Sequence, residues 1–158
     1  NIALRYMAQS LGLEYDLFDS IMNAREIQAK NIAKRLVTEA ELHGLSIWIH
    51  GKSFKPNVSY IDGSYSTLIG HYVKEMGHIV HYIDPLAEDN NPTHVHGVIL
   101  LAHCAEITYD YAEIKKAQEL YCVIQDFSIV VDPWRYLTHA QVNNWGCVLV
   151  QYGNTRFK

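Results

Sequence analysis

The sequence lacks any hydrophobic run near the roughly 20 residues that a membrane-spanning helix needs. It also lacks an excess of basic residues, because 13 Lys and Arg stand against 17 Asp and Glu, for a formal net charge of -4. A nucleic-acid-binding surface requires clustered positive charge. We therefore expect neither a membrane nor a nucleic acid as a partner.

Cysteine is scarce, and the three residues Cys104, Cys122 and Cys147 are widely spaced. No C-x-x-C pair occurs, which argues against a zinc ribbon or a thioredoxin-type site. Reduced, mostly buried thiols in a cytoplasmic protein are the simplest interpretation. Cys104 follows His103 in the layout of an activated thiol, but a small buried core residue is the favoured interpretation there.

The nine histidines do not form a metal motif. His94 and His96 would share one face of a strand, yet no acidic or cysteine ligand joins them at the spacing of a metal site. No metal site is predicted. His50 and His103, each near the end of a predicted strand, are better placed to contact a ligand than to hold a metal.

Two helices are predicted in residues 1–43, where apolar residues recur at helical spacing. The first ends at Gly12, and the second runs from Leu17, past a polar interruption at Gln28, to a stop at His43 and Gly44. The second spans roughly 25 residues, or about 37 Å. A helix of this length usually packs on a dimer partner or a neighbouring domain. Because the chain opens inside a helical pattern, we expect it to be part of a longer protein.

Short apolar strands alternate with helices after residue 44, which predicts an α/β fold with a parallel sheet. The expected strands cover residues 47–49, 79–83, 98–102, 129–131 and 147–150, and the expected helices cover 64–76, 111–120 and 140–144. Residues 121–127 fit either type. The predicted architecture is a helical segment over 1–43 followed by a Rossmann-like parallel-sheet domain over 44–158.

Three loops carry the candidate binding residues, since ligands bind at the carboxyl ends of the strands of an open α/β sheet. They are Gly51-Lys52-Ser53-Phe54-Lys55-Pro56-Asn57, Asp62-Gly63-Ser64-Tyr65-Ser66 and Asp132-Pro133-Trp134-Arg135-Tyr136. On spacing alone, the first is a turn with two solvated lysines, and Ser64 in the second is a helix cap. Arg135 could hold a phosphate and Trp134 could cover a ring, but a turn with an arginine lying over an aromatic residue is favoured.

The runs together resemble the carboxyl-terminal part of the UDP-glucose/GDP-mannose dehydrogenase family. Residues 51–57 are similar to its glycine-x-alanine-phenylalanine-lysine-proline-asparagine signature, and residues 77–85 to a strand that ends in Asp-Pro. Residues 1–23 resemble the central helical region, where a long helix forms the dimer interface. Residues 129–135 resemble the segment with a substrate arginine, and 145–153 the last strand.

The resemblance implies an NAD-dependent dehydrogenase that oxidises the C6 alcohol of a nucleotide sugar to a carboxylate. This part would bind the nucleotide end of a UDP-sugar through Phe54, Lys55 and Arg135, and would form a homodimer through the long helix. The catalytic cysteine and the main NAD site would precede Asn1, so no catalytic residue is expected here. A lysine suits a diphosphate, which carries negative charge.

Two departures from the family pattern indicate a divergent branch. Asp62 stands where the family carries an arginine that reaches the NAD side. Trp134 lies between Asp132-Pro133 and Arg135, so either Arg135 takes the substrate role after a one-residue shift or the contact is lost. The alternative hypothesis is therefore a non-catalytic, Rossmann-like dimerisation module that binds no small molecule.

Overall fold

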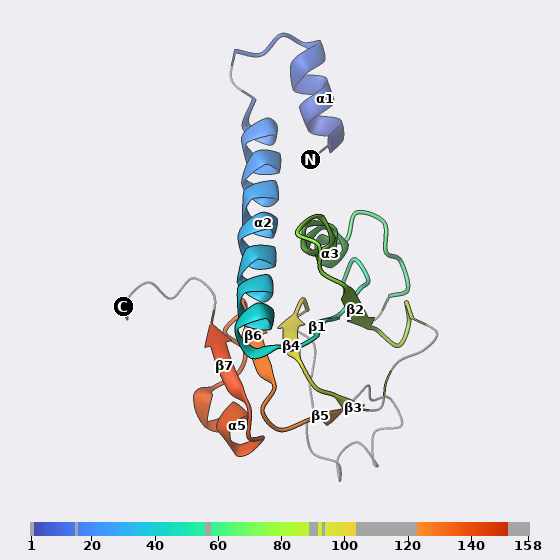
Figure 1. Cartoon of the computed structure of the whole chain (residues 1–158). Helices are drawn as coiled ribbons and strands as arrows, with labels where there is room; N and C mark the ends of the chain where they lie inside the picture. The colour runs from blue at the N-terminus through green and yellow to red at the C-terminus, as the bar shows by residue number, and fades with distance from the viewer. Residues whose placement is uncertain are drawn as a thin grey trace.

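The computed structural model describes residues 2–14, 16–55, 58–88, 92, 94–103 and 123–151. Figure 1 shows their course. The elements are α1 (Ile2–Ser10), α2 (Leu17–His43), β1 (Ile47–His50), α3 (Tyr65–Glu75), β2 (Val80–Ile83), β3 (His94–Val95), β4 (Val98–Leu101), β5 (Val123–Ile124), β6 (Ile129–Asp132), α5 (His139–Asn144) and β7 (Val148–Gln151).

Helix α2 begins and ends where its sequence provides capping residues. The Asp16 carboxylate accepts a hydrogen bond from the Asp19 N–H at 3.0 Å, which satisfies a donor of the first turn. At the other end, Gly44 adopts the left-handed conformation at φ 65° and donates its N–H to the Ala40 carbonyl. The predicted start and stop of this long helix are therefore confirmed.

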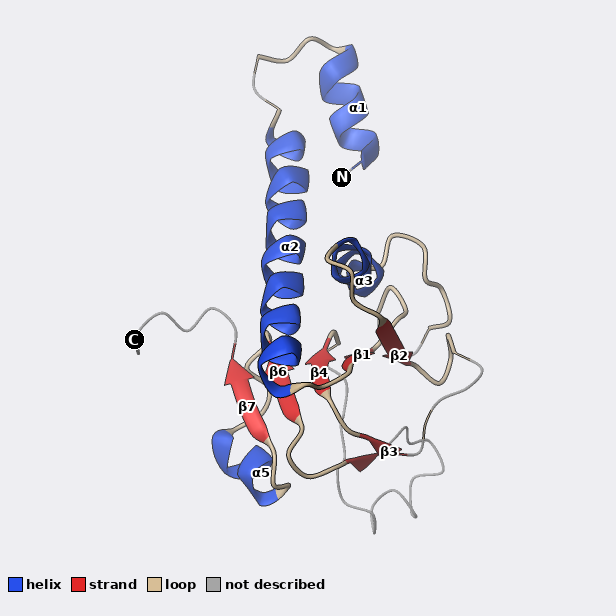
Figure 2. Ribbon diagram, viewed as in Figure 1, coloured by secondary structure: helices blue, strands red, loops and turns tan. Residues whose placement is uncertain are grey.

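The main sheet has five strands, all parallel, in the order β2-β1-β4-β6-β7. Figure 2 shows them from right to left in that order. Taken along the chain, this is the order second, first, third, fourth, fifth, in which the winding direction reverses between β1 and β4. The predicted fold class, a Rossmann-like parallel sheet after an N-terminal helical segment, is thereby confirmed.

The core lies on both faces of this sheet. On one face, the second half of α2 and helix α3 cover Ile47, Ile49, Val98 and Leu100. The other face packs against residues around α5 and around the short parallel pair β3–β5. All four residues of β4 and of β6 are buried, as expected for central parallel strands. No helix in the described ranges is both long enough and apolar enough to cross a membrane.

Predictions about individual strands, histidines and cysteines are confirmed in some cases and wrong or untested in others. Strand β3, with two residues, was not predicted, and β5 lies within the segment 121–127 that fitted either type. His96 lies outside β3, so it does not share a strand face with His94. Cys147 is buried, as expected, whereas Cys104, Cys122 and the helix expected over 111–120 lie outside the described residues. The division into two units at residue 44 stays a prediction.

Candidate functional site

The loop after β1 occupies the point where the winding of the sheet reverses, between β1 and β4. Crevices at this position, outside the carboxyl ends of the strands, are where open α/β sheets bind ligands. Residues 51–55 of the loop are described, and Pro56 and Asn57 lie outside the described residues. The loop contains the predicted binding residues Phe54 and Lys55.

The Asp84 carboxylate fixes the backbone of this loop. One oxygen accepts the N–H groups of Lys52 at 2.9 Å and Ser53 at 2.8 Å, and the other accepts the N–H of Leu86 at 3.1 Å. Burial by itself would raise the pKa of the carboxyl, but the hydrogen bonds from Ser53, Leu86 and Lys52 outweigh it and lower the pKa of Asp84 below its ordinary value. The group is therefore held as an anion.

Two hydroxyls at the start of α3 hold the same loop from the other side. Ser64 Oγ donates to the Ser53 carbonyl at 3.0 Å, and Ser66 Oγ donates to the Lys52 carbonyl at 3.0 Å. The two hydroxyls also contact each other at 2.6 Å. Ser64 does occupy the N-cap position, but its side chain makes no capping hydrogen bond, so the prediction of simple capping is wrong. The hydroxyl is engaged by the loop carbonyl instead.

Gly51, His103 and His50 form the inner side of the loop. Gly51 has φ 96°, and a Cβ there would lie 2.6 Å from His103 Nδ1. His103 Nε2 in turn lies 2.8 Å from the Ser53 carbonyl. Burial, followed by the nearby His103, lowers the pKa of His50 to about 4 although Asp84 acts in the opposite direction. These histidines therefore support the loop from within.

The two lysines of the loop differ in their surroundings. Lys52 forms an ion pair with Glu88 and its ammonium lies 5.4 Å from the centre of the Tyr82 ring. Burial and Glu88 raise the pKa of Tyr82 to about 12, so this ring remains neutral. Lys55 is exposed, and within the described part of the chain its side chain forms no ion pair. The prediction of two solvated lysines is wrong for Lys52.

The loop after β6 is fixed by Asp132 and by Trp134. The buried Asp132 carboxylate accepts the N–H groups of Trp134 at 3.0 Å and Leu137 at 2.8 Å. The Trp134 indole N–H reaches the carbonyls of Leu101 and Ala102 at 3.1 and 3.2 Å. The indole is therefore tied across the end of β4. Arg135 follows, exposed and in the left-handed conformation at φ 55°.

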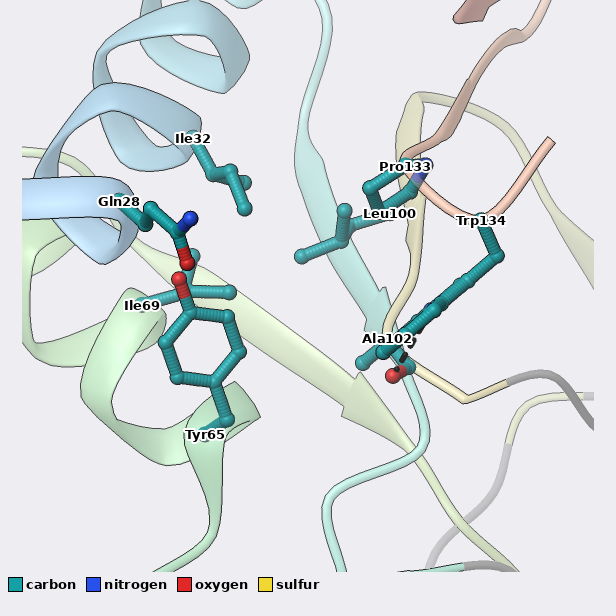
Figure 3. Close-up of a pocket in the computed structure, with 8 residues that line it drawn as sticks. All are labelled: Gln28, Ile32, Tyr65, Ile69, Leu100, Ala102, Pro133 and Trp134. Carbon is teal, nitrogen blue, oxygen red and sulfur yellow. Dashed lines mark hydrogen bonds between the residues drawn. The ribbon is translucent and has the colours of Figure 1, made fainter. Parts of the chain in front are cut away.

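A pocket of about 200 Å³ lies between α2, α3 and the ends of β4 and β6. It is lined by Gln28 and Ile32 of α2, Tyr65 and Ile69 of α3, Leu100 and Ala102 at β4, and Pro133 and Trp134 after β6. Figure 3 shows Gln28 and Tyr65 pointing toward each other on one side, with the Trp134 indole seen edge-on across from them. The walls are mostly apolar, with polar groups at the edge.

The predicted binding residues Phe54, Lys55 and Arg135 all lie at this carboxyl edge of the sheet but do not line the pocket. Phe54 is 57% exposed. Tyr65 and Trp134, which line the pocket, belong to two of the three predicted candidate loops, whereas Gln28 was not predicted as a site residue. Gln28 had a detectable signal, since it interrupts the apolar stripe of α2. Among the described residues, no cluster of three or more His, Cys, Asp or Glu side chains could hold a metal ion.

Compared with known protein families and with curated proteins, the chain matches no family model and no curated sequence.

Proposed function

We propose that this chain is the nucleotide-binding part of an NAD-dependent nucleotide-sugar 6-dehydrogenase resembling the UDP-glucose/GDP-mannose dehydrogenases. In this proposal Phe54, Lys55 and Arg135 contact the nucleotide end of a UDP-sugar. The cysteine nucleophile and the main NAD site belong to the rest of the enzyme, and two copies associate through α2.

One observation carries this proposal: a free, exposed lysine on a rigid loop at the point where the winding of the sheet reverses. Asp84, Ser64, Ser66 and His103 hold the loop backbone. Lys55, unlike Lys52, has no carboxylate partner among the described residues. The fixed backbone determines where the Lys55 side chain starts, so binding a phosphate requires the ordering of that side chain but not of the loop.

The test is calorimetry on the 158-residue chain with millimolar UDP and GDP. Lys55→Ala should weaken UDP binding by about tenfold or more, since a hydrogen bond to a charged group is worth about 1.5–3 kcal/mol. Lys34→Ala, which removes an exposed lysine from α2, should leave binding unchanged. If neither nucleotide produces heat or a shift of the thermal midpoint, the proposal is wrong.

A second candidate function is a non-catalytic dimerisation module, whose dimerisation, shared with the first candidate, is supported by the surface of the first two helices and the turn between them. Large apolar side chains remain exposed there: Leu4, Met7, Leu11, Leu17, Ile21 and Ile27. Figure 1 shows that α1 and the first half of α2 extend beyond the sheet. Such a surface is typical of a protein–protein interface.

Sedimentation distinguishes the two candidates when combined with the nucleotide titration. A dimer without any nucleotide response favours the module, and a dimer that binds UDP favours the dehydrogenase part. Ile27→Asp should shift the chain toward monomer, while Asn31→Asp, the same added charge at another exposed position of α2, should not. A monomer at high protein concentration contradicts dimerisation through α2.

A further inference from the structure

The pocket between α2, α3 and the Trp134 loop has room for a single ring. An apolar cavity of about 150 Å³ can hold benzene, and the volume here is about 200 Å³. Pockets for whole drug-sized ligands usually start at about 300 Å³. The size therefore fits one ring of a ligand whose remaining atoms extend outside.

The fixed indole of Trp134 favours a planar ring. Its N–H is engaged by the carbonyls of Leu101 and Ala102, so the side chain cannot turn away without breaking both hydrogen bonds. In the view of Figure 3 the indole is seen along its edge, across the pocket from Tyr65, and one of its faces is turned toward the space between the walls. Aromatic faces stack on bases of any sequence.

The polar edge of the pocket provides a group that can form hydrogen bonds with the edge of such a ring. The Gln28 amide offers both a donor and an acceptor, the combination that pairs with the edge of a nucleobase. Gln28 is exposed and lies at the one polar position of the α2 stripe.

One wall of the pocket is connected through α3 to the loop that contains Lys55. Tyr65 lines the pocket, and its neighbours Ser64 and Ser66 donate to the carbonyls of Ser53 and Lys52. Arg135 directly follows Trp134 on the opposite wall. The pocket and the two loops that contain Lys55 and Arg135 therefore lie at the same carboxyl edge of the sheet.

We propose that this pocket binds the heterocyclic ring of a nucleotide, stacked on Trp134 and contacted at its edge by Gln28. The identification of the ring as a nucleobase rests on the proposed function, whereas the pocket and the fixed indole in its wall do not. The phosphates would then extend to Lys55 and Arg135. The ring site and the phosphate site are separate and can fail separately.

The experiment is ligand-observed NMR on the full chain, with uridine, guanosine and UDP as probes. The base protons should receive more saturation from the protein than the ribose protons. Gln28→Trp, which places a large side chain over the pocket from an exposed helix position, should weaken uridine binding at least tenfold. Asn31→Trp, on the same helix outside the pocket, should not. Ala102→Phe fills the pocket from the end of β4 and should act like Gln28→Trp, with the thermal midpoint as a check of folding.

Three outcomes separate the two proposals. If UDP binds and depends on Lys55 but is insensitive to Gln28→Trp and Ala102→Phe, the ring site is wrong and the proposed function stands. If uridine binds in the pocket but UDP binds no tighter and ignores Lys55→Ala, the ring site stands and the phosphate site is wrong. If no probe binds, both are wrong.

Discussion

Two strands of the sheet end in the same Asp-Pro pair, but the two carboxylates serve different parts of the chain. Asp84, after β2, accepts the N–H groups of Lys52 and Ser53, more than 30 residues earlier, together with that of Leu86. Asp132, the last residue of β6, accepts the N–H groups of Trp134 and Leu137, which follow it in its own loop. The first carboxylate joins two loops of the site, and the second closes its own turn.

The difference follows from the position of each strand in the sheet. Because β2 pairs directly with β1, its end lies beside the loop after β1, and the backbone donors of that loop meet Asp84. β6 lies between β4 and β7, and the donors that reach Asp132 come from its own loop. The same dipeptide is thus a tertiary link in one place and a local turn in the other.

The largest expected effect is the loss of the tertiary link. Asp84→Asn replaces one acceptor oxygen by an N–H donor that faces backbone donors, and we expect it to destabilise the fold by about 3 kcal/mol. Asp132→Asn should cost about 1–2 kcal/mol, because fewer and more local hydrogen bonds are affected. Urea unfolding monitored by circular dichroism measures both. If the two variants lose the same free energy of unfolding, the two carboxylates contribute equally to stability.

A dependence of stability on pH should arise at His50, on whose pKa the carboxylate of Asp84 acts. The pKa of His50 is about 4 in the fold against 6.5 in the unfolded chain, so the unfolded chain binds the proton first. Stability is then complete above pH 6.5 and falls as the pH drops toward 4, by up to roughly 3 kcal/mol. His50→Gln should remove this slope. The contribution of Asp84, whose pKa is lowered, is lost only below pH 3.8, a separate range of pH.

A smaller effect is expected from Gly51→Ala, which tests the inner side of the loop. Alanine would have to adopt φ 96° and would place its Cβ against His103. We expect a loss of about 2 kcal/mol. Combining it with His103→Ala removes the clash but not the backbone strain, so the double variant should lose less than the sum of the two single variants. Strict additivity would mean that the imidazole readily moves aside.

The smallest effect is expected at the Asp132 turn, where Arg135 adopts φ 55°. Arg135→Gly relieves a conformation unfavourable for side chains, and the greater entropy of glycine in the unfolded chain offsets part of this gain. We expect a stabilisation of about 0.5 kcal/mol, measured by the thermal midpoint. UDP affinity should fall in the same variant. A destabilised protein would indicate that the guanidinium makes contacts that support the turn.

Much of the fold could be predicted from local patterns. The capping residues Asp16 and Gly44 mark the ends of α2, and the apolar runs mark the five strands of the main sheet. β3 could not be found, because two residues carry no detectable periodicity. Strand order was also beyond a local pattern, since it depends on crossovers between distant segments.

The site was predictable to a lesser extent. The loop with Phe54 and Lys55 could be placed at the end of a strand, but not the ion pair of Lys52 with Glu88, which comes from another loop. A capping hydroxyl at Ser64 would accept a backbone N–H, and only the folded chain shows that it instead donates to the Ser53 carbonyl. The pocket combines side chains from four elements, so no short motif encodes it.

Helix α2 is about 40 Å long over its 27 residues, and its buried residues begin only at Ala29. The first contacts that attach the helix to α3 and its preceding loop are therefore those of Arg25, which donates to the Gly63 carbonyl, and of Glu26, which accepts from the Tyr72 hydroxyl. Residues 17–25 form an arm of about 13 Å beyond that point, so a tilt of about 5° there would move the start of the helix by only about 1 Å. Gln28 lies beside the same point, so the wall of the pocket that it forms stays in place when α1 and the start of α2 move.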